Sequence, residues 1–246
     1  TLMQHPGVLF MRLLAPLPLV WIRALGTFMG WILYALAVPR RRVIMVNLAL
    51  CFPQVPLSVR RRWARECVVH FAQAWFDRSW LWNGSEENLR KRLRLIGAVE
   101  ELQGDTPTVI FAPHFFGLDA AGTAINHQIR RPMVSIYTPQ RSQAVDQWLH
   151  DGRRRFGNLA LFYRDQGVKS IVAGLREGAL LYLLSDMNFG PEESIFVPFY
   201  GVQAATVPSL PRFARLGRAK VVPVTVTSPM HITTGSRVEA QAMRKE

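Results

Sequence analysis

One histidine and one aspartate stand five residues apart directly after a short apolar stretch. They are His114 and Asp119, in the segment TVIFAPHFFGLDAAG (108–122). If the apolar stretch is a strand and a helix begins between the two residues, the chain can fold back and bring the carboxylate to one imidazole nitrogen. The other nitrogen would then be free to act as a general base. A pair at this spacing is common in proteins, and an ordinary structural role for both residues is the competing interpretation.

The other residues that could do chemistry narrow the reaction type. The sequence has no G-x-S-x-G elbow, P-loop or G-x-G-x-x-G, and Cys51 and Cys67 have no recognisable catalytic context. A base without a protein nucleophile favours direct transfer, in which a deprotonated substrate hydroxyl attacks an activated carbonyl. No cofactor and no metal is predicted, because the remaining histidines are scattered along the chain: His5, His70, His127, His150 and His231.

Alternating apolar runs and amphipathic stretches surround His114 and must position it. This alternation predicts an α/β protein, with a mixed sheet flanked by helices. A long helix over 57–82 precedes the sheet. We expect strands at 108–112, 132–137, 179–185 and 220–227, and helices at 116–128, 145–156, 169–177 and 208–216.

The positive charge of the chain is concentrated at its beginning. The 246 residues carry a net charge of +13, and 49% of them are hydrophobic, which makes disorder improbable. Residues 1–65 hold nine arginines and no Asp, Glu or Lys, so subtracting nine from thirteen leaves +4 for the rest. Because this charge accompanies the most apolar part of the chain, a membrane rather than nucleic acid is the expected partner.

Residues 8–38 form an apolar segment interrupted only by Arg12 and Arg23. Crossing a bilayer takes about 20 apolar residues, so a spanning helix would have to include Arg23 near one end. The alternative is a hairpin of buried helices broken at Pro16 and Pro18. The sequence therefore predicts an N-terminal apolar, membrane-associated helix. We expect a leader over 1–42, and an α/β domain over 43–246 that begins with a helical connector at 43–100.

At this point the motifs resemble a known family. HFFGLD (114–119) resembles the H-x4-D/E motif of the lysophospholipid acyltransferase superfamily. Three further stretches resemble its bacterial lipid A branch, the lauroyl/myristoyl acyltransferases. They are RRRVIMVNLALCFP (40–53), LHDGRRRFGN (149–158), and the block from SDMNFG to KVVPV (185–224).

The resemblance implies a reaction, its partners and its location. A fatty acyl chain would pass from acyl carrier protein to a hydroxyl of a Kdo-bearing lipid A precursor, at the cytoplasmic face of the bacterial inner membrane. Another glycerolipid or a glycolipid is the alternative acceptor. Two other classes stay open: a non-catalytic membrane-surface protein, and a nucleic-acid binder whose affinity would depend steeply on salt.

The resemblance also implies roles for individual residues. His114 would be the base, Asp119 its orienting carboxylate, and Arg153 the ligand of an anionic group or of the developing oxyanion. Asp186 would lie in the substrate site without a specified role, and Gly201 and Thr206 would line that site. The branch usually has Y-R-P where this chain has Tyr137-Thr138-Pro139, so Arg141 would have to supply the missing arginine. Family members also continue past the end of this sequence, which implies a truncated C-terminus.

Overall fold

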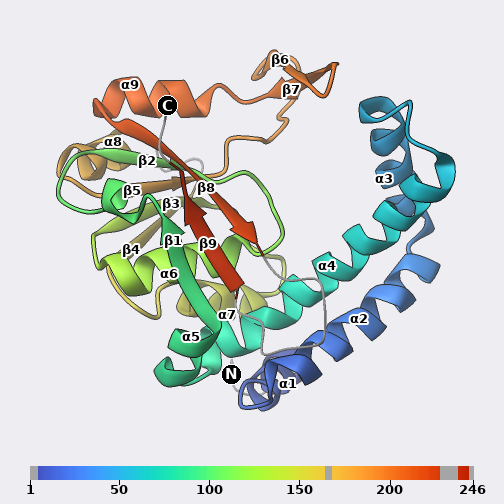
Figure 1. Ribbon diagram of the computed structural model, residues 1–246. Helices are drawn as coiled ribbons and strands as arrows, with labels where there is room; N and C mark the ends of the chain where they lie inside the picture. The colour runs from blue at the N-terminus through green and yellow to red at the C-terminus, as the bar shows by residue number, and fades with distance from the viewer. Residues whose placement is uncertain (1–4, 164–167, 228–237, 244–246) are drawn as a thin grey trace.

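A seven-stranded sheet with helices on both faces forms the body of the protein. The computed structural model describes residues 5–163, 168–227 and 238–243. The predicted α/β fold class is confirmed, and the first four helices extend from one side of this body (Figure 1). The described strands are β1 (Leu93–Gly97), β2 (Thr108–Phe111), β3 (Met133–Tyr137), β4 (Leu159–Tyr163), β5 (Leu180–Leu183), β6 (Ile195–Phe199), β7 (Val202–Thr206), β8 (Lys220–Thr227) and β9 (Val238–Ala242).

The helices alternate with these strands after a helical beginning. Those described are α1 (Pro6–Leu14), α2 (Leu19–Leu36), α3 (Val38–Cys51), α4 (Leu57–Asn83), α5 (Glu86–Arg92), α6 (Leu118–Ile129), α7 (Gln143–Arg153), α8 (Val168–Arg176) and α9 (Ser209–Gly217), with a 3-10 turn, η2 (Val99–Leu102).

The strand order of the sheet is β1-β9-β8-β2-β5-β3-β4. Within the described chain, β8 and β9 are its only antiparallel neighbours. β2 lies between β5 and β8 and runs parallel to both, with Phe111 opposite Leu183. The carboxyl ends of β2 and β5 therefore meet at one edge, which is where open parallel sheets bind ligands.

Successive residues of the central strands bury opposite faces of the sheet, as the pleat requires. Ile110 of β2 belongs to the larger buried cluster, which includes Ala121 of α6. Its neighbour Val109 belongs to a second cluster with Leu175 of α8 and Phe213 of α9. Both faces of β2 are thus covered, and its position in the sheet is fixed.

α2 packs along α4 at very short range. A Cβ atom on Gly26 would lie 2.8 Å from the Cα of Gln73, and one on Gly30 would lie 2.6 Å from the Cα of Val69. Glycine at these two positions lets the helix backbones approach, as small residues four apart commonly do. Helices α1 and α2 are separated at residues 15–18, where the alternative interpretation of the sequence placed a break at Pro16 and Pro18.

β6 and β7 form a separate antiparallel hairpin outside the main sheet (Figure 1). Its base is tied to the loop after β5, since the Val207 N–H donates to the Met187 carbonyl at 3.0 Å. At its tip the ring of Tyr200 lies 4.8 Å from that of Phe52, which follows α3. The hairpin therefore joins the sheet edge to the α3–α4 corner.

The predicted elements of the body are confirmed to within a few residues. The strand expected at 108–112 is β2, and the helix expected at 57–82 is α4. Five strands were not predicted (β1, β4, β6, β7 and β9), and β1 lies within the segment 43–100 that was expected to be a helical connector.

Candidate active site

His114 and Asp186 are joined by two hydrogen bonds. The imidazole Nδ1 lies 2.7 Å from Oδ1 of Asp186, and the His114 backbone N–H donates to Oδ2 at 2.8 Å. The side chains are 43% and 35% exposed, respectively. The imidazole is therefore held by a carboxylate while remaining accessible to a substrate.

The strand register brings these two residues together. His114 follows the end of β2 by three residues, and Asp186 follows the end of β5 by three. The two ends are paired, and the Ala112 N–H donates to the Leu183 carbonyl at 3.0 Å. Equal offsets from the ends of two adjacent parallel strands thus place the two side chains opposite each other.

Asp186 is ionised at neutral pH. Burial alone would raise its pKa, but the side-chain and backbone hydrogen bonds from His114 outweigh burial and lower the pKa below its ordinary value. An ionised carboxylate only accepts hydrogen bonds, so Nδ1 of His114 carries the proton. Nε2 of the neutral ring is then an acceptor, as a general base requires.

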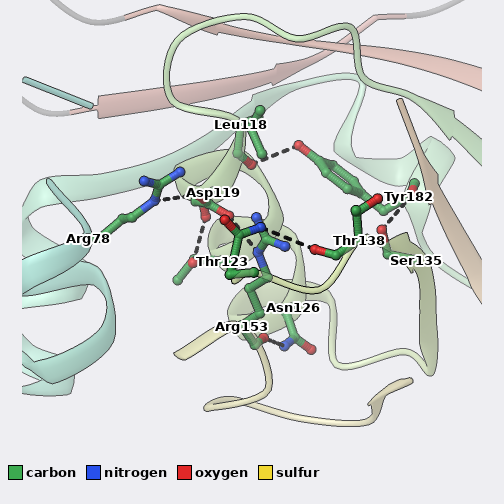
Figure 2. Close-up of polar contacts among 10 residues, drawn as sticks. Arg78, Leu118, Asp119, Thr123, Asn126, Ser135, Thr138, Arg153 and Tyr182 are labelled. Atoms are coloured by element: carbon green, nitrogen blue, oxygen red, sulfur yellow. Dashed lines mark hydrogen bonds and ion pairs between the residues drawn. The ribbon is translucent and has the colours of Figure 1, made fainter. Parts of the chain in front are cut away.

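Asp119 does not hold the imidazole, and that part of the prediction is wrong. Its Oδ2 accepts from Nε of Arg78 at 2.8 Å, and its Oδ1 accepts from Nε of Arg153 at 2.9 Å. Figure 2 shows the two guanidinium groups reaching Asp119 from two sides. His114 does precede the helix as expected, but the carboxylate faces α4 and α7.

The surroundings of Asp119 make it a buried anion with strong partners. Its side chain is 7% exposed. Burial alone would raise its pKa, but the charges and hydrogen bonds of Arg153 and Arg78 outweigh burial and lower the pKa to about 2. Asp119 also lies in the first turn of α6, where the helix dipole favours a negative charge. The residue therefore ties α6 to α4 and α7.

Arg78 was missed by the sequence reasoning. Its guanidinium lies over the rings of Trp75 at 4.3 Å and Trp82 at 5.6 Å, and its buried Nη1 has no hydrogen-bond partner within the described residues. The available signal was the adjacent charged pair Asp77-Arg78 inside an otherwise apolar part of α4. Together, Arg78, Asp119 and Arg153 carry a net charge of +1.

The other predicted site residues, Thr206, Gly201 and Arg141, lie in different parts of the structure. Thr206 ends β7, next to Val207 at the hairpin base, and so lies beside the Asp186 loop. Gly201 lies at the opposite end of the hairpin, with φ 78°. Arg141 is exposed in the loop between β3 and α7.

Exposed apolar side chains flank the His114–Asp186 pair on both loops. Phe115 and Phe116 follow His114 and are 47% and 41% exposed, and Met187 follows Asp186 and is 37% exposed. The ring of Phe116 lies 6.3 Å from that of His70 on α4. The His114–Asp186 pair is therefore bordered by exposed apolar side chains.

Among the described residues, no group of three or more His, Cys, Asp or Glu side chains lies close enough together to hold a metal ion. The side chains that surround the pair offer acid–base chemistry and apolar contact.

Comparison with known proteins identifies the family of this chain. The profile of the bacterial lipid A biosynthesis acyltransferases matches residues 2–232. The chain belongs to this family. The enzyme class predicted from the motifs, acyltransferase, is confirmed at the level of the family.

Three relatives within the lipid A acyltransferase family illustrate the similarity. A lipid A biosynthesis acyltransferase of Haemophilus influenzae is 32% identical over 89% of this chain and 69% of its own length. The lipid A biosynthesis myristoyltransferase of Escherichia coli is 31% identical, over 81% of this chain and 61% of its own. The lauroyltransferase of E. coli is 24% identical, over 88% and 70%. The chain thus spans 61–70% of the length of these relatives.

Proposed function

We propose that this chain transfers a fatty acyl group from the thioester of acyl carrier protein to a hydroxyl of a Kdo-bearing lipid A precursor, with His114 as general base. The observation that carries the proposal is the 2.7 Å contact between Nδ1 of His114 and Asp186 at the sheet edge, in a chain of the lipid A acyltransferase family. Asp186 takes the orienting role that the motif had given to Asp119.

The reaction needs no covalent enzyme intermediate. Nε2 of His114 removes the proton of the acceptor hydroxyl as its oxygen forms a bond to the thioester carbonyl carbon. The ionised Asp186 stabilises the resulting imidazolium through Nδ1. The tetrahedral oxyanion then collapses, the C–S bond breaks, and the carrier thiolate takes the proton from the imidazolium. The products are the acylated acceptor and the free carrier thiol.

Arg153 supplies a fixed positive charge in this scheme. Its pairing with Asp119 restrains the guanidinium, and its side chain remains 25% exposed. We assign it the anionic group of the acceptor or the developing oxyanion, which a guanidinium suits because it stays charged and presents several donors. Arg78 adds a second charge to the same cluster, held by the other oxygen of Asp119.

The apolar side chains beside the pair provide contact for an acyl chain. Phe115, Phe116 and Met187 are exposed beside His114 and Asp186. Grouped exposed apolar side chains are typical of surfaces that bind an apolar ligand. We assign Thr206, Gly201 and Arg141 to the surrounding substrate surface, with Thr206 the nearest to Asp186 along the hairpin.

We also propose that residues 1–42 associate with the bacterial inner membrane and leave the domain over 43–246 on its cytoplasmic face. In support, α2 is long and apolar enough to cross a membrane by length and composition, and all nine charges in residues 1–65 are arginines. The basic chain also matches an acidic carrier and an acceptor bearing phosphates and carboxylates.

Mass spectrometry of the acceptor after incubation with acyl carrier protein tests the reaction. The wild-type protein should add one acyl mass to the Kdo-lipid A precursor. His114→Ala should lower the rate by about 10³-fold, since general base catalysis contributes about 10²–10⁴. His127→Ala is a matched control, because this histidine packs on Phe156 near the end of α6.

Two results would contradict the proposal. Near-normal transfer by His114→Ala would remove the base assignment. Transfer to a glycerophospholipid but not to the lipid A precursor would overturn the acceptor and favour the alternative glycerolipid reaction.

A further inference from the structure

α2 has one face bound to α4 and an opposite face exposed to the surroundings. Gly26 lies against Gln73 of α4, whereas Trp21, Phe28 and Trp31 are 66%, 62% and 53% exposed. At about 100° per residue, these three aromatic side chains lie on the side of the helix opposite Gly26. We call them, with Ala24 and Ala35 on the same side, the outer face of α2.

The exposed apolar surface continues along the chain on both sides of α2. Leu13 of α1 is 65% exposed and Leu17 before α2 is 39% exposed. Val43 and Val46 of α3 are each 57% exposed. Soluble proteins rarely expose so much apolar surface over adjoining elements, so this surface is suited to an apolar partner.

Charged residues of α4 are tied to α2 at two levels. Arg23 pairs with Asp77 at 2.9 Å near the start of α2, and the Arg65 guanidinium lies 4.9 Å from the ring centroid of Trp31. Arg23 and Trp31 are eight residues apart, which is about 12 Å along a helix. The hydrocarbon core of a bilayer is about 30 Å thick. If the α2–α4 pair crossed a bilayer as a unit, it would carry at least one of these charged groups into the hydrocarbon, which is costly.

Helix α3 and the first turns of α4 carry exposed arginines. Arg40 and Arg42 of α3 and Arg61 and Arg62 of α4 are exposed, and residues 1–65 contain no acidic side chain. Such a group of arginines attracts the anionic headgroups of a membrane. Apolar surface next to arginines is the composition of a helix that lies in the membrane interface.

We propose that α2 does not cross the membrane: it lies in the plane of an anionic bilayer, held by α4, with its outer face sunk into the boundary between headgroups and acyl chains. This inference rests on the membrane association proposed above and specifies its geometry. α4 packs on the side of α2 that carries Gly26 and Arg23 and reaches Trp31 only through Arg65, and the lipid covers the outer face.

Depth measurements with single labels on the outer face test the geometry. The full chain with Cys51→Ser and Cys67→Ser receives a fluorescent label at Trp21→Cys, Phe28→Cys or Ala35→Cys. The labelled protein is bound to vesicles of phosphatidylethanolamine and phosphatidylglycerol. These vesicles contain lipids that carry a fluorescence quencher at a known depth. Gln103→Cys, exposed after η2, is the control in water. Ala24→Cys replaces any outer-face variant that fails to fold by circular dichroism.

A helix in the interface predicts one common depth for the three labels, about 5–10 Å below the headgroups, and no quenching at Gln103→Cys. A spanning helix instead puts Phe28 at the bilayer centre and the other two labels about 10 Å shallower, since each is seven residues away. That gradient would overturn the inference. Absence of quenching at all three positions would also overturn it, because the occupant would not be a bilayer.

Acyl transfer is measured on the same labelled proteins. Transfer with a depth gradient contradicts only the geometry, whereas a common depth without transfer by the unlabelled wild-type protein contradicts only the proposed reaction.

Discussion

Two aspartates near the sheet edge are ionised in opposite surroundings. Asp119 is 7% exposed and is held by the guanidinium groups of Arg78 and Arg153. Asp186 is 35% exposed and holds His114, which is itself 43% exposed. A buried carboxylate between two fixed cations fixes the positions of helices. A carboxylate on a partly exposed imidazole orients the ring and leaves it open to the surroundings.

The largest expected effect separates the two carboxylates by activity. Asp186→Asn should lower kcat/KM for acyl transfer by about 10³-fold, because the amide no longer selects the Nδ1–H tautomer or stabilises the imidazolium. Its free energy of unfolding should change little, since the side chain is partly exposed. Steady-state kinetics and urea unfolding measure both quantities. Asp151→Asn, an exposed change on α7, is the control, and equal activities of the two variants would remove Asp186 from the mechanism.

The second largest expected effect is on stability and concerns Asp119, the buried aspartate. Asp119→Asn should lower the free energy of unfolding by about 3–5 kcal/mol, because two guanidinium groups lose their carboxylate in a buried site. Urea unfolding followed by circular dichroism measures the loss. A change below about 1 kcal/mol would show that the ion cluster does not hold the helices together.

Low pH should also lower the free energy of unfolding through Asp119, by less than the Asp119→Asn substitution does. The folded-state pKa of Asp119 is lowered from 3.8 to about 2. A depressed carboxyl pKa contributes stability that is full above the unfolded pKa and is lost as the pH falls through the folded one. We expect a loss of about 2 kcal/mol between pH 4 and pH 2 that is absent in Asp119→Asn. Unfolding curves at several pH values test this, and identical acid profiles for the two proteins would contradict it.

The smallest effect concerns a neighbour of the ion cluster. The Tyr182 hydroxyl donates to the Leu118 carbonyl at 2.8 Å, and burial raises the pKa of Tyr182 far above its ordinary value, so it stays protonated. Tyr182→Phe should cost about 1 kcal/mol of stability, the value of one buried hydrogen bond. Acyl transfer at low temperature should fall less than threefold. A loss comparable to that of His114→Ala would instead place Tyr182 in the reaction.

The position of His114 between a strand and a helix could be predicted because the pattern that indicates it is local. A short apolar strand, a loop and an amphipathic helix are visible within 15 residues, and they correctly predicted that His114 precedes α6. The partner of His114 was not visible, because Asp186 is 72 residues away and reaches it only through the parallel pairing of β2 with β5. The spacing of five residues therefore pointed to Asp119, the nearest acid along the chain.

The contact between Asp119 and Arg78 could not be predicted from the sequence for the same reason. Their contact joins residues 41 apart on two helices, and the charged pair Asp77-Arg78 in an apolar part of α4 does not indicate which residue Arg78 contacts. The packing of α2 on α4 is similar, because the close approach at Gly26 and Gly30 depends on contacts with residues more than 35 positions away. Strand β6 is largely exposed and β7 is only partly buried, so both lack the buried apolar pattern that identified β2 and β5.

A double-mutant cycle of acyl transfer tests most directly whether Asp186 acts through His114. The rates of Asp186→Asn and Asp119→Asn are measured in the wild-type and the His114→Ala proteins, at a temperature where all variants are folded. We predict that Asp186→Asn has no further effect once His114 is gone, whereas Asp119→Asn has the same effect with and without it. If Asp119→Asn instead loses its effect in His114→Ala while Asp186→Asn keeps its own, Asp119 is the orienting carboxylate and the assignment of Asp186 is wrong.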